Sequence, residues 1–202
     1  APSGWHTSWN CDRTDNVVWG VEKYFTDDYG VTYVLFADGT ASIAGVSGIV
    51  SEIVLGGHPE FPVTEIPANL LNGRSDITKI TIHSDITKIG AYAFYFMTKL
   101  NEVEFEAGSK AASIGTGAFG YSKLLKTITL PASVEEIKAN AFVASAGLET
   151  VTFEEGSALT TMGNYVFLNC TALKSVYLPD GVTSIGASIL NGAKQATVQV
   201  AN

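Results

Sequence analysis

The 202-residue chain has few cysteines and no long apolar run, and each shortage excludes a class of protein. Its two cysteines, Cys11 and Cys170, are too few for a disulfide framework. The repeat register places them roughly four layers apart, beyond the ~7 Å Cα limit for a bridge, so we predict two free thiols. Charges and glycines break the apolar stretches well short of the roughly 20 residues that a bilayer span needs, so we expect no membrane insertion. The chain begins without the charged start and apolar run of an export signal, and we expect a mature or shortened form that has lost any such signal.

The chain is also short of basic residues, with 12 Lys and Arg against 20 Asp and Glu and a net charge of −8. No basic stripe is present, which excludes nucleic acid as a partner, and the acidic balance disfavours anionic lipid surfaces. His6, His58 and His83 lack metal-ligand spacing, and we find no nucleophile motif or phosphate-binding glycine loop. We therefore predict that the protein is not an enzyme and holds no cofactor.

The chain is rich instead in one repeated six-residue pattern. An aliphatic residue, usually followed by glycine, opens the pattern, and an aliphatic residue followed by phenylalanine closes it. The copies are Ile89–Phe94, Ile114–Phe119, Ile137–Phe142, Met162–Phe167 and, with leucine in place of phenylalanine, Ile185–Leu190. Their last residues lie 25, 23, 25 and 23 positions apart. A fixed period in this range is typical of a solenoid, in which each unit buries its apolar face only against its neighbours.

Each copy is preceded by a segment in which apolar and polar residues alternate, the pattern of a half-buried strand. These segments are 77–82, 100–105, 125–130, 148–153 and 173–178. We predict that each strand pairs in parallel with the next, so that the inward residues and the phenylalanines form columns with ring centres about 4.5–7 Å apart. The glycine near the start of four copies predicts either a positive φ or a close backbone approach.

The N-terminal part departs from the pattern. A degenerate copy comes first, with residues 50–55 as its strand and Leu71 at the phenylalanine position. Upstream of it, residues 33–43 predict a β-hairpin around Asp38-Gly39, and residues 17–25 predict a further strand.

At the other end, Val198–Val200 predicts a lone strand that closes the sheet. We therefore predict an N-terminal β cap region over residues 1–48. A solenoid follows over residues 49–202, with five to six repeats of 22–27 residues and the closing strand.

Two segments carry a family resemblance. The first segment is a strand ending in Leu-Pro, followed by valine, isoleucine and Ala-Phe, and it comprises Thr127–Val134, Ile137 and Ala141-Phe142. The second segment, Tyr177–Gly186, repeats the first half of this motif. The chain resembles, over roughly residues 33–200, the bacterial surface-antigen (BspA-like) leucine-rich repeat proteins. The resemblance implies a right-handed superhelix with a parallel sheet on its concave face. It also implies a cell-surface or secreted adhesin that binds a host matrix or cell-surface protein.

The outward strand positions are the candidate binding surface, because solenoids usually bind on their concave face. Exposed threonine is also simply a good strand former, which leaves a purely structural interpretation open. Glu102, Glu104 and Glu106 lie on one strand and offer oxygen ligands for calcium, but a solvated patch paired with Lys79 is the better interpretation. The predicted site residues are Lys79, Thr81, Glu102, Glu104, Thr127, Thr129, Thr150, Thr152, Ser175 and Tyr177.

A second candidate site is the aromatic N-terminal segment with Trp5, Trp9 and Trp19. Clustered aromatics predict either a glycan or protein contact site or an end cap that shields the first strand. The function predicted first is a non-catalytic protein-binding or adhesion module. The alternatives are a carbohydrate-binding module that uses these tryptophans and a structural spacer in a larger exported protein.

Overall fold

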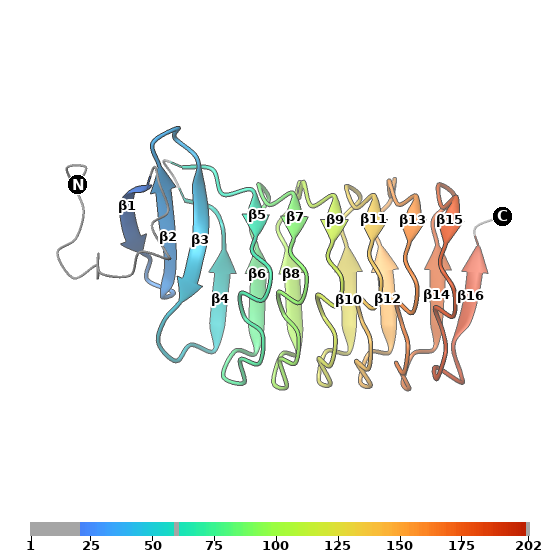
Figure 1. Ribbon diagram of the computed structural model, residues 1–202. Coiled ribbons are helices and arrows are strands. Elements are labelled where there is room, and N and C mark those ends of the chain that lie inside the picture. Colours follow the sequence, from blue (N-terminus) through green and yellow to red (C-terminus); the bar gives the residue numbers. More distant parts are fainter. Residues whose placement is uncertain (1–20, 59–60, 201–202) are drawn as a thin grey trace.

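The computed structural model describes residues 21–58 and 61–200 as a β-solenoid with a small sheet at its N-terminal end (Figure 1). The described residues contain no helix, and hence none that could cross a membrane. The terminal sheet is antiparallel, in the order β1-β2-β3, with β1 (Val21–Thr26), β2 (Val31–Phe36) and β3 (Ala41–Val46). β2 and β3 form the hairpin predicted around Asp38-Gly39.

Each repeat contributes a long strand of four residues and then a short strand of two, and strands of successive repeats pair in parallel. The long strands are β4 (Glu52–Leu55), β6 (Lys79–Ile82), β8 (Glu102–Phe105), β10 (Thr127–Leu130), β12 (Thr150–Phe153), β14 (Ser175–Leu178) and β16 (Thr197–Val200). The short strands are β5 (Glu65–Ile66), β7 (Lys88–Ile89), β9 (Ser113–Ile114), β11 (Glu136–Ile137), β13 (Thr161–Met162) and β15 (Ser184–Ile185). The predicted fold class, a mainly β repeat solenoid with parallel sheets and an N-terminal β cap, is confirmed.

The ladder of long strands is interrupted, so the prediction that every strand pairs with the next is wrong at one step. Strands β4, β6 and β8 form one sheet and β10, β12, β14 and β16 another, and no pairing joins β8 to β10 among the described strands. β8 ends in the half-buried Phe105, whereas β6 and β10 end in the fully buried Ile82 and Leu130. The change recurs at Phe153, where β12 pairs with β14 only over its first two residues. We attribute both openings to the larger ring, which cannot enter the space that an aliphatic side chain fills.

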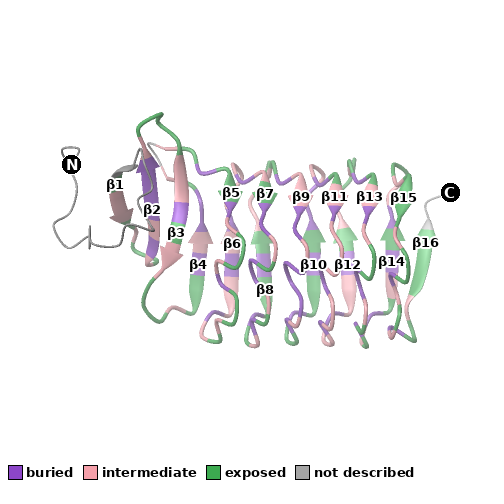
Figure 2. Cartoon of the chain, viewed as in Figure 1, coloured by how far each residue is buried: buried purple, intermediate pink, exposed green. Residues whose placement is uncertain are grey.

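The predicted aromatic column runs through the core. Phe94, Phe119, Phe142 and Phe167 are fully buried, and their successive ring centroids lie 5.1, 5.4 and 5.5 Å apart. Along the long strands, buried residues alternate with more exposed ones (Figure 2), as the period of two requires. Each of the two middle rings therefore packs between the rings of the layers before and after it, which is how units this small acquire a core.

The repeated glycines allow the backbones of successive turns to approach closely. A Cβ atom on Gly90 would lie 2.5 Å from the backbone nitrogen of Ala68, and one on Gly115 would lie 2.5 Å from the carbonyl oxygen of Ile89. Neither glycine has a positive φ. Of the two predicted reasons for glycine at this position, close approach is therefore correct and positive φ is wrong.

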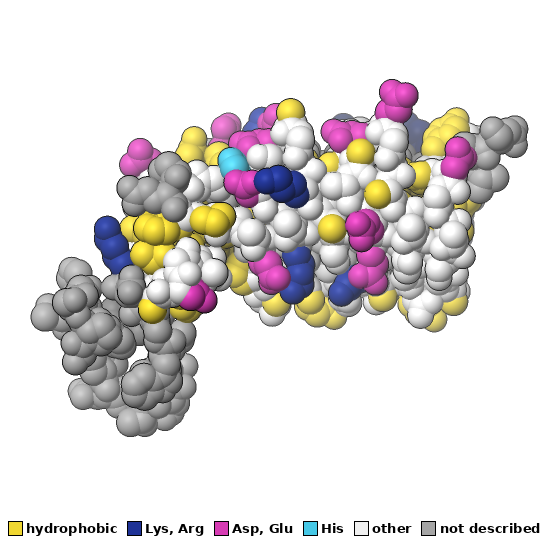
Figure 3. Space-filling model, turned by 90° about the horizontal axis from the view of Figure 1, so that it is seen from above, with side chains coloured by type: hydrophobic (Ala, Val, Ile, Leu, Met, Phe, Trp, Pro, Cys, Tyr) yellow, Lys and Arg dark blue, Asp and Glu magenta, His cyan; other side chains and the backbone are white. Residues whose placement is uncertain are grey.

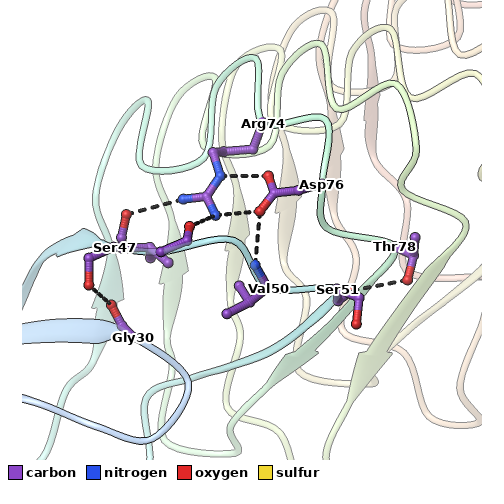
Figure 4. A network of polar contacts seen from close by, with 9 residues as sticks. Gly30, Ser47, Val50, Ser51, Arg74, Asp76 and Thr78 are labelled. Carbon is purple, nitrogen blue, oxygen red and sulfur yellow. Dashed lines mark hydrogen bonds and ion pairs between the residues drawn. The ribbon is translucent and has the colours of Figure 1, made fainter.

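A polar network fastens the segment between β3 and β4 to the first repeat (Figure 4). Arg74 donates to both carboxylate oxygens of Asp76, from Nε at 2.8 Å and from Nη2 at 2.7 Å. Its remaining donors reach the carbonyls of Val46 at 3.1 Å and Gly48 at 3.0 Å. The Asp76 carboxylate also accepts from the backbone nitrogen of Val50 at 3.0 Å. The network fixes the path by which the chain passes from the cap into the solenoid.

Cys170 is a free, fully buried thiol within the repeats. Its Sγ donates to the carbonyl oxygen of Phe142 at 2.9 Å, and burial raises the pKa of the thiol to about 12. The prediction of a free thiol is confirmed for Cys170, while Cys11 lies outside the described residues.

Candidate binding surface

The long-strand face consists of the outward side chains of the long strands, the face that we predict to be concave. In β10, for example, Thr127 and Thr129 are exposed on either side of the buried Ile128. Thr127 pairs with Thr150, which pairs in turn with Ser175, so outward residues lie side by side. The predicted residues thus lie on two adjoining sheets, with Lys79, Thr81, Glu102 and Glu104 on β6 and β8, and Thr127, Thr129, Thr150, Thr152, Ser175 and Tyr177 on β10, β12 and β14.

The N-terminal part of this face is charged. Lys79 Nζ lies 2.7 Å from Glu102 Oε1 and 3.0 Å from Glu104 Oε2. These distances confirm the predicted pairing, and hydrogen bonds to the two carboxylates raise the pKa of Lys79 above its usual value. Within residues 21–58 and 61–200, no group of three or more His, Cys, Asp or Glu side chains is arranged to hold a metal ion.

Glu106, the third acidic residue of this segment, directly follows β8 and contacts instead the turn that follows β6. Its Oε2 lies 3.5 Å from His83 Nε2 and accepts from the backbone nitrogen of Ser84 at 3.2 Å. Nearby, Lys110 Nζ donates to Asp85 Oδ1 at 2.6 Å, and this bond lowers the pKa of Asp85. Figure 3, which views the molecule from above, shows acidic and basic side chains interspersed along the solenoid. Much of the charge is therefore compensated within the chain.

The C-terminal part of the long-strand face is neutral. Thr129 and Thr152 on adjacent strands share a hydrogen bond between their hydroxyls at 2.8 Å. Beyond them, Tyr177 is 62% exposed, which leaves most of its ring open to contact.

Two grooves open where the long-strand ladder loosens. The larger, of about 460 Å³, lies between β12 and β14, and Phe153, Tyr177 and Leu178 are among its lining residues. The smaller, of about 270 Å³, lies at the break between β8 and β10. Sequence reasoning missed both grooves. The available signal was Phe105 and Phe153 at a position where the other repeats carry isoleucine or leucine.

The second candidate site cannot be placed, because Trp5, Trp9 and Trp19 lie outside the described residues. Within the described part of the cap, Phe25 stacks on Tyr33 with ring centroids 4.9 Å apart and lies 4.1 Å from the ring of His58. Since His58 follows β4, this aromatic cluster joins the cap to the first repeat.

Comparison with known proteins adds a family match and several similar structures. The family model described as the BspA type leucine rich repeat region matches in six copies over residues 64–197. No match was found among curated proteins.

Among solved structures, the pneumococcal vaccine antigen PcpA is similar with a TM-score of 0.73 and 23% identity over 91% of this chain and 51% of that chain. A leucine rich cell surface protein from Faecalibacterium prausnitzii is similar with a TM-score of 0.59 and 23% identity, over 88% of this chain and 54% of that chain. The leucine rich repeat protein from T. pallidum is similar with a TM-score of 0.57 and 24% identity, over 86% of this chain and 70% of that chain. These similarities show a shared fold, and the chain spans about half the length of the first two proteins.

Proposed function

Because the chain belongs to the BspA-type leucine-rich repeat family, we propose that it is a non-catalytic module, at the cell surface or secreted, that binds a protein and mediates adhesion. The observation that carries the proposal is the long-strand face, where strand pairing holds polar side chains in register. A surface fixed in this way loses little conformational freedom when it binds. The names of two similar structures, a vaccine antigen and a cell surface protein, support the location.

Within that face, we place the centre of the contact at the groove between β12 and β14. Tyr177 supplies a large exposed ring at the rim, and Phe153 and Leu178 supply an apolar lining. A tyrosine beside an apolar pocket is the usual composition of an interface hot spot. Lys79 contributes less, because its charge is already satisfied by two glutamates. The partner we expect is a host matrix or cell-surface protein.

The test is the binding of the chain to immobilised host matrix proteins and to intact host cells. Tyr177→Ala should weaken binding by about tenfold or more, because it removes the main anchor of the groove. The matched control is Tyr165→Ala, since Tyr165 is 39% exposed but follows β13 and lies outside the groove. Equal binding by the wild-type chain and Tyr177→Ala would contradict the site. If no matrix protein or host cell retains the wild-type chain, the proposed function fails and the spacer alternative replaces it.

A further inference from the structure

Every repeat passes twice through left-handed backbone conformation between its short strand and the next long strand. The φ angles at these positions lie between 54° and 81°. The first positions are Asn69, Tyr92, Gly117, Asn140, Tyr165 and Ser188, and the second are Gly73, Phe96, Tyr121, Ala144, Asn169 and Gly192. Glycine and asparagine tolerate this conformation, whereas bulky residues rarely adopt it. Four of the twelve positions carry aromatic residues, which therefore adopt a positive φ that is unfavourable for their type.

Burial does not explain these aromatic residues. Tyr92 is 39% exposed and Phe96 47%, although the phenylalanines of the core column are fully buried. The repeats that carry asparagine or glycine at the same positions form the same turns, so the fold does not require a ring there. Strained residues that are not needed for packing are typical of functional sites.

Three of the four, together with Tyr95, form one cluster that we call the aromatic edge: Tyr92, Tyr95, Phe96 and Tyr121. The planes of neighbouring rings in this cluster are steeply inclined to one another and are not stacked in parallel. The Tyr92 and Tyr95 centroids lie 5.3 Å apart at 88°, those of Tyr95 and Tyr121 5.2 Å apart at 63°, and those of Phe96 and Tyr121 5.8 Å apart at 46°. The cluster therefore presents ring edges and ring faces together, not a flat platform.

Two glycines of the following repeat make room for this cluster. A Cβ atom on Gly117 would lie 2.5 Å from Tyr92 Cε1, and one on Gly120 would lie 2.9 Å from Tyr95 Cδ2. The rings thus lie directly against glycine backbone, and a side chain at either position would displace them. One repeat thus supplies Tyr92 and Tyr95, and the next supplies the glycines against which their rings pack.

The aromatic edge lies in a row of uncharged repeat segments. The repeat segments 68–73, 91–96, 116–121, 139–144, 164–169 and 187–192 contain no Asp, Glu, Lys or Arg, although the chain has 20 acidic and 12 basic residues. Asparagine, glycine and tyrosine recur in them, and all three are residue types enriched in antibody contact loops. These segments therefore offer a partner ring contacts and neutral hydrogen bonds but no ion pair.

These features favour one kind of partner. Tilted aromatic rings suit the compact rings of proline, and tyrosine hydroxyls can donate to the solvated carbonyls of a polyproline II segment. A glycan is less well served, because the tilted rings offer no flat platform on which a sugar ring can stack. Burial and a side-chain hydrogen bond with Tyr121 raise the pKa of Tyr95, so the Tyr95 hydroxyl is engaged within the cluster.

We propose that the aromatic edge binds an uncharged, proline-rich extended segment of a partner protein. This surface comprises other residues than the long-strand face, so the two sites can be tested separately. An extended proline-rich segment is already ordered before it binds, which favours recognition by a small surface.

The experiment measures binding of a synthetic peptide of about ten prolines, a length of roughly 31 Å in this conformation. We expect saturable binding whose affinity changes less than about twofold between roughly 0.05 and 0.5 M salt, because no ion pair is involved. Tyr92→Asn and Phe96→Asn should each weaken binding by about tenfold or more. The urea midpoint of each variant should stay equal or rise, since other repeats carry asparagine at these positions.

The matched control is Tyr165→Asn, which makes the same change at the same repeat position, with the same 39% exposure, outside the cluster. It should bind the peptide as the wild-type chain does, and so should Tyr177→Ala on the long-strand face. The proposal is overturned if the peptide does not bind or if the two asparagine variants bind it unchanged. It is equally overturned if the urea midpoint falls sharply in both variants, because the rings would then be structural. Binding of a neutral oligosaccharide at the same residues, in place of the peptide, would overturn the assignment to proline.

Discussion

Equivalent residues of the repeat have opposite environments at the two ends of the solenoid. Ile66 in the first short strand is 1% exposed, whereas Ile185 in the last is 48% exposed. Ile53 in β4 is 1% exposed, and Val198 in β16 is 40% exposed. At the N-terminal end β3 lies against β5, while β15 ends its sheet with no described strand on its outer side. The comparison shows that a repeat residue is buried by the neighbouring layer and not by its own unit.

The largest contrast should come from truncating the aromatic column in the middle and at the open end. Phe119→Ala should destabilise the chain by about 3–5 kcal/mol, because the ring is fully buried between two others. Leu190→Ala at the same position of the last repeat should cost about 1–2 kcal/mol, since that side chain is only partly buried. Urea unfolding of both variants measures the difference. Equal costs would show that the last repeat is covered as well as the middle one.

The capped end should weaken when its polar network is broken. Arg74→Ala leaves two carbonyls without a donor and removes both guanidinium bonds of Asp76, which should cost about 2 kcal/mol. The loss should be local, because the network holds the cap to the first repeat. Hydrogen exchange should therefore accelerate in β1–β3 more than in β11–β13. A uniform acceleration would contradict this role.

The same network predicts a pH dependence at the capped end. Hydrogen bonding to Arg74 lowers the pKa of Asp76 below its ordinary value. The resulting stability is complete above the unfolded pKa of about 3.9 and is lost as pH falls through the lower folded pKa. The stability difference between the wild-type chain and Asp76→Asn, about 1–2 kcal/mol near neutral pH, should therefore stay constant down to pH ~5 and shrink below ~4. Urea titrations at a series of pH values measure it, and a difference that grew in acid would count against the pair.

The smallest effect should come from the exposed residue at the open end. Ile185→Thr should cost less than about 1 kcal/mol, because half of the side chain already contacts water. Ile137→Thr, the same change in a fully buried short strand, should cost more than about 2 kcal/mol. Thermal unfolding of the two variants would sharpen the comparison of ends and middle.

Much of the fold could be predicted because the strands and repeats follow from the periodic spacing of apolar residues along the chain. Alternation at residues 125–130 predicted β10, and the phenylalanine spacing predicted the column of rings. The break between β8 and β10 could not be predicted in this way, because it depends on whether Phe105 fits between two neighbouring layers. The aromatic edge was missed for a similar reason. Its signal was the aligned series of asparagine, glycine and tyrosine, whose meaning required the φ angles.

The sequence by itself determined that the chain is a solenoid, where its strands lie and which side chains face inward. These properties follow from a period of two within each strand and a period of about 24 between repeats. Both periods can be read along the chain without knowing how the repeats pack. Tertiary structure decided where the strand ladder opens, which exposed rings meet and which end of the stack is covered. Those outcomes depend on contacts between layers, and such contacts arise only when one repeat lies on another.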